Sequence, residues 1–295
     1  MYTSSSQTNP FSLSFGKEPL SHIERDYQNN EILQSFEAEN PAYQVCMLTG
    51  ARGSGKTVAL TTIANQLRSN KNWIVADLNP ERDLLHALTA ELSNRKELLQ
   101  LFRDAKINLS VLGFGLEIDG EPPVTDLVVA LRRMLEKLTR SGKRVLVTVD
   151  EVSSTPGMRE FASQFQIFVR QDFPIYLIMT GLYENIYEIQ NDPSLTFLLR
   201  TPKIITEPLS ILQITRQYKD IFDIDEKSAS KLANITKGYA FAFQALGVCY
   251  WDKKNDGMDA VMDEFDELLD DFVYRKIWSS LTAKEREIIR AVPGV

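Results

Sequence analysis

The sequence predicts an α/β protein in which a parallel sheet, covered by helices on both faces, is followed by a smaller all-helical domain. From about residue 41, short apolar or β-branched runs alternate with segments of helical spacing. This alternation is typical of a parallel sheet with crossover helices. After Pro208 the strand-like runs stop and only helical segments follow. A chain of 295 residues is long enough for roughly two domains.

Five runs are expected to form the strands, because each is short, apolar and bounded by polar or turn-forming residues. They are Gln44–Thr49, Trp73–Asp77, Arg144–Val149, Ile175–Thr180 and Lys203–Thr206. The polar segment before them contains one helical stretch, Asp26–Ala38. The strands therefore begin only after an N-terminal extension of about 40 residues.

Capping signals predict where two crossover helices begin. Leucines recur with helical spacing after Thr125, which is expected to be the N-cap, and Gly142 stands where that helix would end. A second helix is expected to start at Asn79-Pro80-Glu81, since Asn79 can cap and proline suits the first helical position. Between these two helices, the alternating segment Ile107–Glu121 predicts a hairpin.

The C-terminal third predicts a small helical domain. Its expected helices are Ile211–Phe222, Glu226–Ile235, Ala240–Trp251 and Gly257–Trp278. A further helix is indicated by Thr282 with Glu285 three residues later, the pattern of a capping box. Because the sequence stops soon afterwards, this last helix suggests a truncated C-terminal domain.

Composition excludes several classes of protein. No apolar run approaches the ~20 residues that span a bilayer, and the polar start has no signal-peptide core. We therefore expect a cytoplasmic protein with no membrane partner. The two cysteines, Cys46 and Cys249, lie far apart among apolar neighbours. They are interpreted as buried hydrophobic residues and not as a disulfide or metal site.

The net charge of −7 is concentrated in one segment. Residues 252–271 contain nine acidic residues and two lysines, and the rest of the chain is neutral. No basic stripe of the kind that follows a phosphate backbone is present, so direct DNA binding by this stretch of chain is not supported. The acidic segment is interpreted as a solvated helix face, with docking of a basic partner as the alternative.

The sharpest motif is a complete G-x-x-x-x-G-K-T, Gly50 to Thr57, placed between a predicted strand and a predicted helix. Its glycines let backbone N–H groups converge on phosphate oxygens, Lys56 can reach the β- and γ-phosphates, and Thr57 can supply a hydroxyl to Mg²⁺. The side chain of Arg52 is expected to face solvent. The predicted nucleotide-binding residues are Gly50, Ala51, Arg52, Gly53, Ser54, Gly55, Lys56, Thr57 and Val58.

Hydrolysis requires a second element, and two adjacent carboxylates provide it. The hydrophobic strand Arg144–Val149 ends in Asp150 and Glu151. At the strand tip Asp150 can hold Mg²⁺ together with Thr57, while Glu151 can polarise a water toward the γ-phosphate. Lys56 and Glu151 are therefore the first catalytic candidates. P-loop kinases of small metabolites usually lack such a glutamate, which disfavours them.

With these residues in view, the chain resembles the AAA+/STAND group of P-loop ATPases, close to the archaeal-ATPase and origin-initiator-like branch. The resemblance extends over most of the chain. Besides the two motifs above, it rests on Asn9-Pro10-Phe11, Phe15-Gly16, Met179-Thr180-Gly181-Leu182, Thr196 to Arg200 and Thr236-Lys237-Gly238-Tyr239. It implies binding of ATP or ADP with Mg²⁺ and a three-layer αβα sandwich with the parallel strand order 5-1-4-3-2, followed by a helical lid.

The resemblance also implies a division of the chain. Residues 1–40 would be an N-terminal segment, partly extended and near the nucleotide; residues 41–207 would form the P-loop core. Residues 208–278 would form the lid, and residues 279–295 would begin a winged-helix-like domain. DNA contact would then be possible only through that missing C-terminal domain.

Two further site residues come from the resemblance alone. Thr180 stands where such ATPases place a polar sensor at the tip of the fourth strand; the alternative is a hydroxyl that caps the next turn. Arg200 stands where many members have an arginine that reaches the γ-phosphate of a neighbouring subunit; the alternative is an ordinary surface arginine.

The chain departs from the family in two places. Many relatives have Gly-Tyr-Pro where this chain has Gly238-Tyr239-Ala240, and Gln244 lies near the usual position of a nucleotide-sensing arginine. The side-chain amide of Gln244 is uncharged, so it cannot neutralise the negative charge of a γ-phosphate. At the N-terminus, Glu24-Arg25-Asp26 stands where relatives tend to have Gly-Arg-Asp, with Arg25 or its neighbours expected near the adenine.

Three functions remain in competition. The first is a Mg²⁺-dependent ATPase whose nucleotide state controls self-association or engagement of a protein partner, which Glu151 and Arg200 favour. The second is a regulatory switch or scaffold that binds ATP or ADP and barely hydrolyses it, favoured by Gln244 and the missing proline. The third is a DNA-acting ATPase resembling initiators or transposition helpers.

Overall fold

The computed structural model describes residues 8–14, 19–23 and 25–292, and it divides into two compact units. The sheet unit consists of Arg25–Ala51 and Lys56–Thr206. The helical unit consists of Met1–Glu24, Arg52–Gly55 and Glu207–Val295. Of the residues quoted above, Phe15, Gly16 and Glu24 lie outside the described residues.

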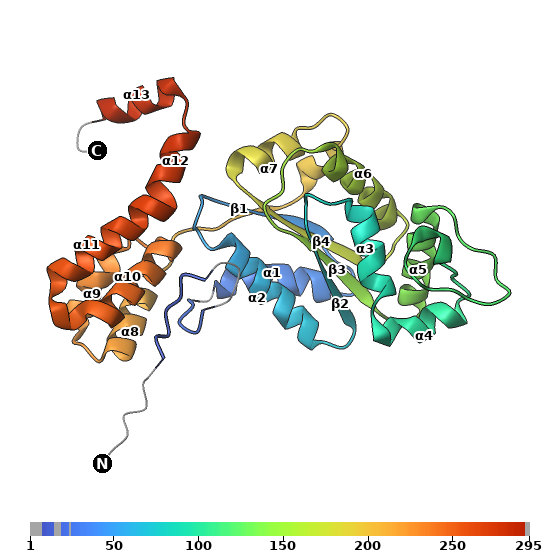
Figure 1. Cartoon of the computed structure of the whole chain (residues 1–295), viewed down its shortest axis with the longest axis horizontal. Coiled ribbons are helices and arrows are strands. Elements are labelled where there is room, and N and C mark those ends of the chain that lie inside the picture. Colours follow the sequence, from blue (N-terminus) through green and yellow to red (C-terminus); the bar gives the residue numbers. More distant parts are fainter. Residues whose placement is uncertain (1–7, 15–18, 24, 293–295) are drawn as a thin grey trace, which may run out of the picture. The chain divides into compact units, whose positions relative to one another are not determined.

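Five parallel strands form the sheet, in the order β2-β3-β4-β1-β5, which confirms the expected order (Figure 1). They are β1 (Val45–Thr49), β2 (Trp73–Leu78), β3 (Arg144–Val149), β4 (Ile175–Gly181) and β5 (Lys203–Ile205). Each lies within one residue of its predicted position at either end. Such agreement is expected for β1 to β4, which are buried on both faces and marked by apolar runs, whereas only Ile204 of the short edge strand β5 is buried.

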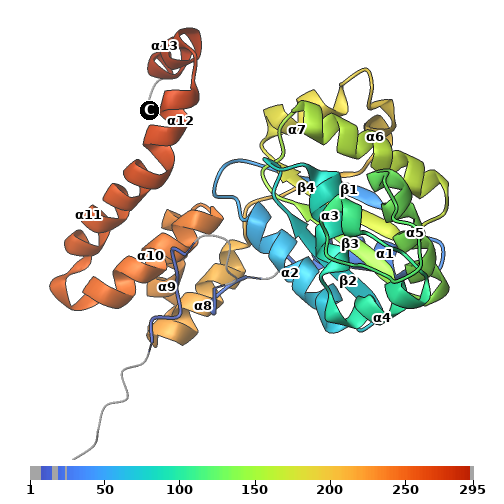
Figure 2. The ribbon, with the colours of Figure 1, turned by 45° about the vertical axis from the view of Figure 1, so that its right-hand side comes forward.

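Helices cover both faces of this sheet, as predicted (Figure 2). Cys46 and Leu48 of β1 pack on one side with α1 (Asp26–Glu37) and α2 (Lys56–Ser69). Val45 and Met47 pack on the other side, because alternate side chains of a strand point to opposite faces. That side is covered by α3 (Leu84–Ser93), α4 (Lys96–Asp104), α5 (Leu127–Arg140), α6 (Pro156–Arg170) and α7 (Tyr183–Gln190).

Two predicted N-caps were wrong for the same reason, one by four residues and the other by a single residue. The N-cap of α3 is Asp83, which accepts from the N–H of His86, whereas Asn79 instead organises a turn by accepting the N–H of Glu81. Likewise Asp126, and not Thr125, caps α5 by accepting the N–H of Val129. Several polar residues could cap at each place, and packing of the first buried helical turn selects between them.

The hairpin predicted over Ile107–Glu121 does not form. The segment contains a single 3₁₀ turn, η1 (Ser110–Leu112), and is otherwise irregular. Leu109 and Leu116 are both buried and share one backbone hydrogen bond of 2.7 Å. The side chain of Asn108 binds the carbonyls of Ile118 and Glu121. Alternation in the sequence therefore reflects anchoring of a loop onto the core.

The helical unit contains the predicted helices with small changes at their ends. Its elements are α8 (Ile211–Phe222), α9 (Glu226–Ile235), α10 (Ala240–Lys253), the 3₁₀ helix η3 (Lys254–Asp256), α11 (Met258–Leu269), the π-helix η4 (Asp270–Tyr274), α12 (Arg275–Ser280) and α13 (Ala283–Ala291). The N-terminal segment completes its core: the ring of Phe11 packs against Tyr218, Phe222 and Phe243. The capping box of Thr282 and Glu285 is present, as expected.

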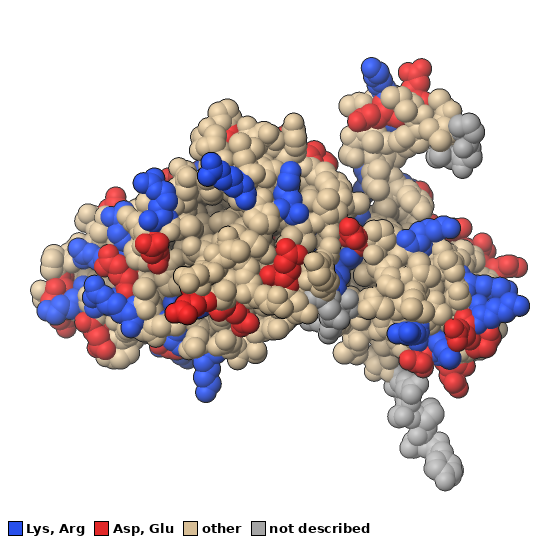
Figure 3. Space-filling view, turned by 180° about the vertical axis from the view of Figure 1, so that it is seen from behind, with Lys and Arg blue, Asp and Glu red and all other residues tan. Residues whose placement is uncertain are grey.

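The acidic segment lies on an amphipathic helix. Val261, Phe265 and Leu269 of α11 are buried, while the acidic residues between them are exposed or half-exposed. Three of the carboxylates form ion pairs, Lys253 with Glu264 and Arg275 with Asp270 and Asp271. On the molecular face in Figure 3, positive and negative side chains are interspersed. This arrangement favours the solvated-face interpretation. Within the described residues, no helix has the length and apolar character needed to cross a membrane.

Candidate functional site

The loop Gly50–Thr57 joins the end of β1 to the start of α2. Gly53 and Gly55 have φ angles of +71° and +91°, which residues with a side chain rarely adopt. The buried Lys56 turns back across the loop, and its ammonium donates to the carbonyls of Gly50 and Ala51, each at 2.9 Å. Two carbonyls at the start of the loop therefore hold the ammonium of Lys56 in place.

Asp150, directly after β3, connects the loop with the neighbouring strand. Its Oδ2 accepts a hydrogen bond of 2.8 Å from the hydroxyl of Thr57. Its Oδ1 accepts a hydrogen bond from the hydroxyl of Thr180, which is fully buried at the end of β4. Both carboxylate oxygens are therefore oriented by hydroxyl groups that come from two other elements.

Glu151 adopts an unusual backbone conformation. Its φ is +55°, in the left-handed region, which costs of order 1 kcal/mol for a residue with a side chain. The strain is balanced by local hydrogen bonds: its N–H lies 3.1 Å from Oδ1 of Asp150 and 3.2 Å from Oγ1 of Thr180. The carboxylate itself is exposed. A strained, solvent-facing carboxylate beside an oriented one is an arrangement typical of catalytic sites.

The sheet topology explains why these residues meet. Strands β3, β4 and β1 are neighbours and parallel, so their carboxyl ends lie along one edge. Gly50, Asp150 and Thr180 stand at or just beyond those ends. Ligands of open α/β sheets bind in the crevice at this edge. Thr180 does not cap the next helix, because the N-cap of α7 is Leu182 and has no side-chain cap.

The oxygen atoms at this edge of the sheet are of the kind that coordinates Mg²⁺. The Thr57 hydroxyl and the Asp150 carboxylate are hard oxygen ligands 2.8 Å apart. Among the described residues, no group of three or more His, Cys, Asp or Glu side chains gathers as a metal cage. Protein-bound Mg²⁺ usually takes one or two protein oxygens, with water and phosphate completing the shell. The residues present therefore fit a magnesium ion that arrives with a nucleotide.

Arg200 stands apart from this group. It ends η2 (Thr196–Arg200), just before β5 begins, and it is exposed. Arg200 lies before the amino end of β5, which pairs with Met47 to Thr49 of β1, whereas the loop follows the carboxyl end of β1. The structure does not bring Arg200 together with Lys56 or Asp150 of the same chain.

Gln244 has a structural role within the helical unit. Its Oε1 accepts the N–H of Ser12 at 3.0 Å, and its Nε2 donates to the carbonyl of Ser21 at 3.0 Å. Gly247, one turn later, leaves room for the ring of Phe11: a Cβ there would come within 2.3 Å of it. The position that prompted comparison with a sensing arginine thus anchors the N-terminal segment. Arg25 is the N-cap residue of α1, and its place near the adenine stays a prediction.

A contact that sequence reasoning missed involves Arg52–Gly55, the part of the loop that belongs to the helical unit. The hydroxyl of Tyr239 donates to the carbonyl of Arg52 at 2.6 Å. The backbone N–H of Phe241 donates to the carbonyl of Gly53 at 3.1 Å. As expected, the Arg52 residue is exposed. No local sequence signal identifies these partners, which are almost 190 residues away along the chain.

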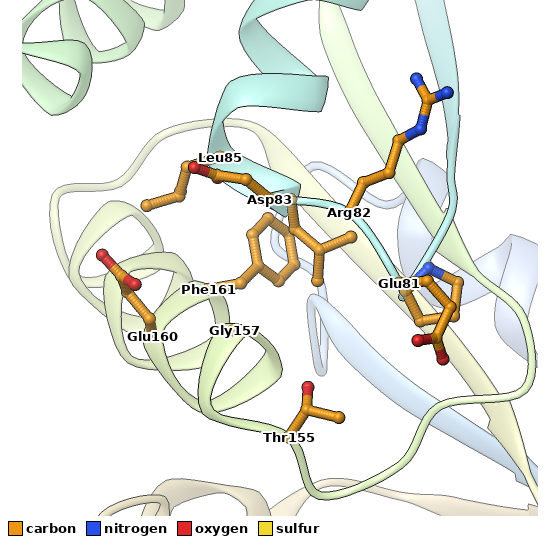
Figure 4. Close-up of a pocket in the computed structure, with 10 residues that line it drawn as sticks. Glu81, Arg82, Asp83, Leu85, Thr155, Gly157, Glu160 and Phe161 are labelled. Atoms are coloured by element: carbon orange, nitrogen blue, oxygen red, sulfur yellow. The ribbon is translucent and has the colours of Figure 1, made fainter.

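A cavity of about 320 Å³ opens elsewhere at the same edge of the sheet (Figure 4). Residues Pro80 to Leu85, which follow β2, form one wall, and the first turns of α6 form the other, with Phe161 between them. Glu81, Arg82, Asp83 and Glu160 are exposed at its rim. Sequence reasoning did not find it, because it placed a helix start at Asn79-Pro80 where the structure has a turn.

A protein-family model described as "AAA ATPase domain" matches residues 22–159. The ORC2 protein of Aeropyrum pernix, solved as ADPNP-ADP complexes, is similar with a TM-score of 0.55 and 12% identity, over 87% of this chain and 68% of that chain. No match to a curated protein was found.

Two further solved structures are similar. The ORC1 protein of A. pernix in complex with DNA has a TM-score of 0.53 and 13% identity, over 87% of this chain and 68% of that chain. Cdc6p of Pyrobaculum aerophilum has a TM-score of 0.52 and 18% identity, over 84% of this chain and 66% of that chain. At such identities the similarity shows a shared fold.

Proposed function

We propose that this chain binds Mg-ATP and hydrolyses it to ADP and phosphate. The proposal is supported by the match of residues 22–159 to the AAA ATPase domain model and by the fold that the chain shares with the Orc and Cdc6 proteins. The observation that carries the proposal is the hydrogen bond of 2.8 Å between Thr57 of the loop and Asp150 at the end of β3. It joins the phosphate-binding and metal-binding elements at one edge of the sheet.

Phosphate binding is assigned to the loop. Backbone N–H groups of a glycine-rich loop and the N-terminus of the following helix together attract phosphate oxygens. Lys56 is already held at the loop by two carbonyls, so little side-chain entropy is lost when its ammonium contacts the β- and γ-phosphates. Mg²⁺ bound by Thr57 and Asp150 would neutralise charge on the phosphates.

Bond cleavage is assigned to Glu151. Its exposed carboxylate would accept a proton from a water as the water oxygen attacks the γ-phosphorus and the bond to the β–γ bridging oxygen breaks, with ADP as the leaving group. Thr180 would act as a positioning residue, because its hydroxyl binds Asp150 and accepts the N–H of Glu151. The two acidic groups would thus keep separate roles.

Removal of the metal or of its hydroxyl ligand tests the proposal. Wild-type protein should bind ATP in calorimetry, and chelation of Mg²⁺ should weaken that binding at least about tenfold. Thr57→Val should have a similar effect because it removes the hydroxyl, whereas Thr57→Ser, which keeps it, should bind almost as the wild type does. Equal ATP affinity with and without Mg²⁺, and in both variants, would contradict the assigned metal site.

We propose that Arg200 acts in the site of a second copy of the chain, since it is exposed and precedes the amino end of β5, whereas the loop follows the carboxyl end of β1. Hydrolysis per chain should therefore rise with protein concentration. Arg200→Ala should lower the rate about tenfold or more and leave ATP affinity within about twofold, because an arginine acting in trans stabilises transition-state charge. Phosphate release and calorimetry measure the two quantities.

The matched control for Arg200 is Arg170→Ala, which removes an exposed arginine from the end of α6, shortly before β4. It should leave the rate unchanged. Mixing Arg200→Ala with Glu151→Gln protein should recover activity that neither variant has alone, since the mixture contains one intact composite site. A concentration-independent rate with no recovery on mixing would return Arg200 to an ordinary surface role.

A second candidate function is a regulatory switch that binds ATP or ADP and barely hydrolyses it. The polar atoms of Gln244 are engaged by Ser12 and Ser21, so this helix supplies no cation to a γ-phosphate from that position. Wild-type phosphate release no higher than that of Lys56→Ala would favour the switch. A DNA-acting role has no comparable support, because the charged side chains in Figure 3 form no continuous basic stripe on the face shown.

A further inference from the structure

Two donors at the start of α10 reach the phosphate-binding loop. They are the hydroxyl of Tyr239, which is the N-cap residue of this helix, and the backbone N–H of Phe241 in its first turn. Their acceptors are consecutive carbonyls, those of Arg52 and Gly53. The first N–H groups of a helix have no partner inside the helix, so the loop satisfies one of them here.

The planarity of the peptide bond links these two carbonyl contacts to the directions of the N–H groups that follow them. In a planar trans peptide, the C=O of one residue and the N–H of the next point in opposite directions. A hydrogen bond that fixes the carbonyl of Arg52 therefore also fixes the direction of the N–H of Gly53. In the same way, the bond from Phe241 to the carbonyl of Gly53 fixes the N–H of Ser54. Both N–H groups face away from α10.

The backbone before α10 holds Tyr239 firmly. Lys237 and Gly238 both have left-handed φ angles, +52° and +74°, and reverse the chain after α9. Gly238 cannot carry a side chain there, because a Cβ would lie 2.6 Å from the carbonyl of Leu209. The same glycine accepts the N–H of Leu209 through its own carbonyl at 2.7 Å. The conformation of this turn therefore sets the position of Tyr239 beside the loop.

The fit at Gly53 is close. A Cβ on this residue would lie 2.2 Å from the hydroxyl oxygen of Tyr239 and 3.1 Å from the Cβ of Phe241. Burial raises the pKa of Tyr239 to about 12, with a smaller contribution from Tyr274. The phenol consequently remains protonated, and able to donate, throughout the physiological pH range.

We propose that Tyr239 is a positioning residue for nucleotide binding: together with the N–H of Phe241, it fixes the N–H groups of Gly53 and Ser54 in the direction in which they meet phosphate oxygens. This inference rests on the proposed function, because it assigns a role within the same phosphate site. It goes beyond the glycine-rich motif, since it gives a role to a residue that lies almost 190 positions later in the chain.

Tyr239→Phe tests the proposal in the full chain, because it removes the hydroxyl and keeps the ring. Loss of a single hydrogen bond that preorganises the loop should weaken Mg-ATP binding about fivefold to tenfold in calorimetry. Without nucleotide, the N–H of Phe241, which donates to the loop carbonyl of Gly53, should exchange with deuterium measurably faster than in the wild type, because the loop is held less firmly against the start of α10. We refer to exchange at this amide as loop exchange. A purely structural tyrosine would not change exchange at that one amide.

The matched control is Tyr218→Phe. It also removes a phenol hydroxyl from the helical unit, one that donates to the carbonyl of Phe243 at 2.7 Å in the buried core. This control should lower the melting temperature but leave loop exchange and ATP affinity unchanged. Unchanged loop exchange and affinity in Tyr239→Phe, or tighter ATP binding, would overturn the proposal. If wild-type protein binds no ATP, the proposed function fails, while loop exchange without nucleotide still decides the role of Tyr239.

Discussion

Lys56→Ala should reduce the affinity for Mg-ATP at least about hundredfold, because it deletes the only side-chain ammonium of the loop and with it charge-assisted hydrogen bonds to two phosphates, each worth about 1.5–3 kcal/mol. Isothermal calorimetry measures the loss. Phosphate release should fall to background in the same variant, which makes it the baseline for every other activity measurement.

The fold should persist in Lys56→Ala. The side chain accounts for two hydrogen bonds to the carbonyls of Gly50 and Ala51, at the mouth of the loop and outside the hydrophobic clusters that hold the sheet between its helices. Circular dichroism should show unchanged helix content. Lys231→Ala, which removes an exposed lysine from α9, is the matched control and should bind ATP as the wild type does. Unchanged ATP affinity in a folded Lys56→Ala protein would remove the basis for the phosphate site.

The sequence predicted the sheet well, because four of its five strands, β1 to β4, are buried on both faces. Arg144–Val149 was predicted at its observed bounds, since a run of five buried residues between a charged residue and an aspartate leaves little ambiguity. Helix starts were less predictable. Asn79 and Asp83 are both good caps, and the choice depends on which turn buries Leu84 and Leu85 against the sheet. Such a choice is made by tertiary packing, which a local pattern does not contain.

The same distinction applies to the site. The motif Gly50 to Thr57 and the pair Asp150-Glu151 could be found from the sequence, because each depends on residue types at fixed spacing after a strand. The left-handed backbone of Glu151 could not, since only glycine and asparagine commonly signal positive φ. Nor could the bond from Tyr239 to Arg52, which exists because the turn at Lys237-Gly238 directs a distant helix start to the loop.

Glu151→Gln should lower kcat for ATP hydrolysis about 100-fold to 1000-fold while ATP affinity stays within about threefold of wild type, since a general base contributes to the transition state and little to ground-state binding. The amide keeps the size of the side chain. The backbone N–H that binds Asp150 and Thr180 is unaffected, so the metal-binding carboxylate stays oriented. Single-turnover phosphate release and calorimetry separate the two effects.

A second variant separates catalysis from structure at the same position. Glu151→Gly should abolish turnover without loss of thermal stability, because glycine adopts a φ of +55° without the cost that glutamate bears there. Glu160→Gln, an exposed glutamate on α6 beyond the same strand, should retain wild-type kcat. Wild-type turnover in Glu151→Gln would remove the general base from the mechanism. If Glu151→Gly is at least as stable as the wild type but has no turnover, the strained backbone at residue 151 is retained for hydrolysis and not for stability.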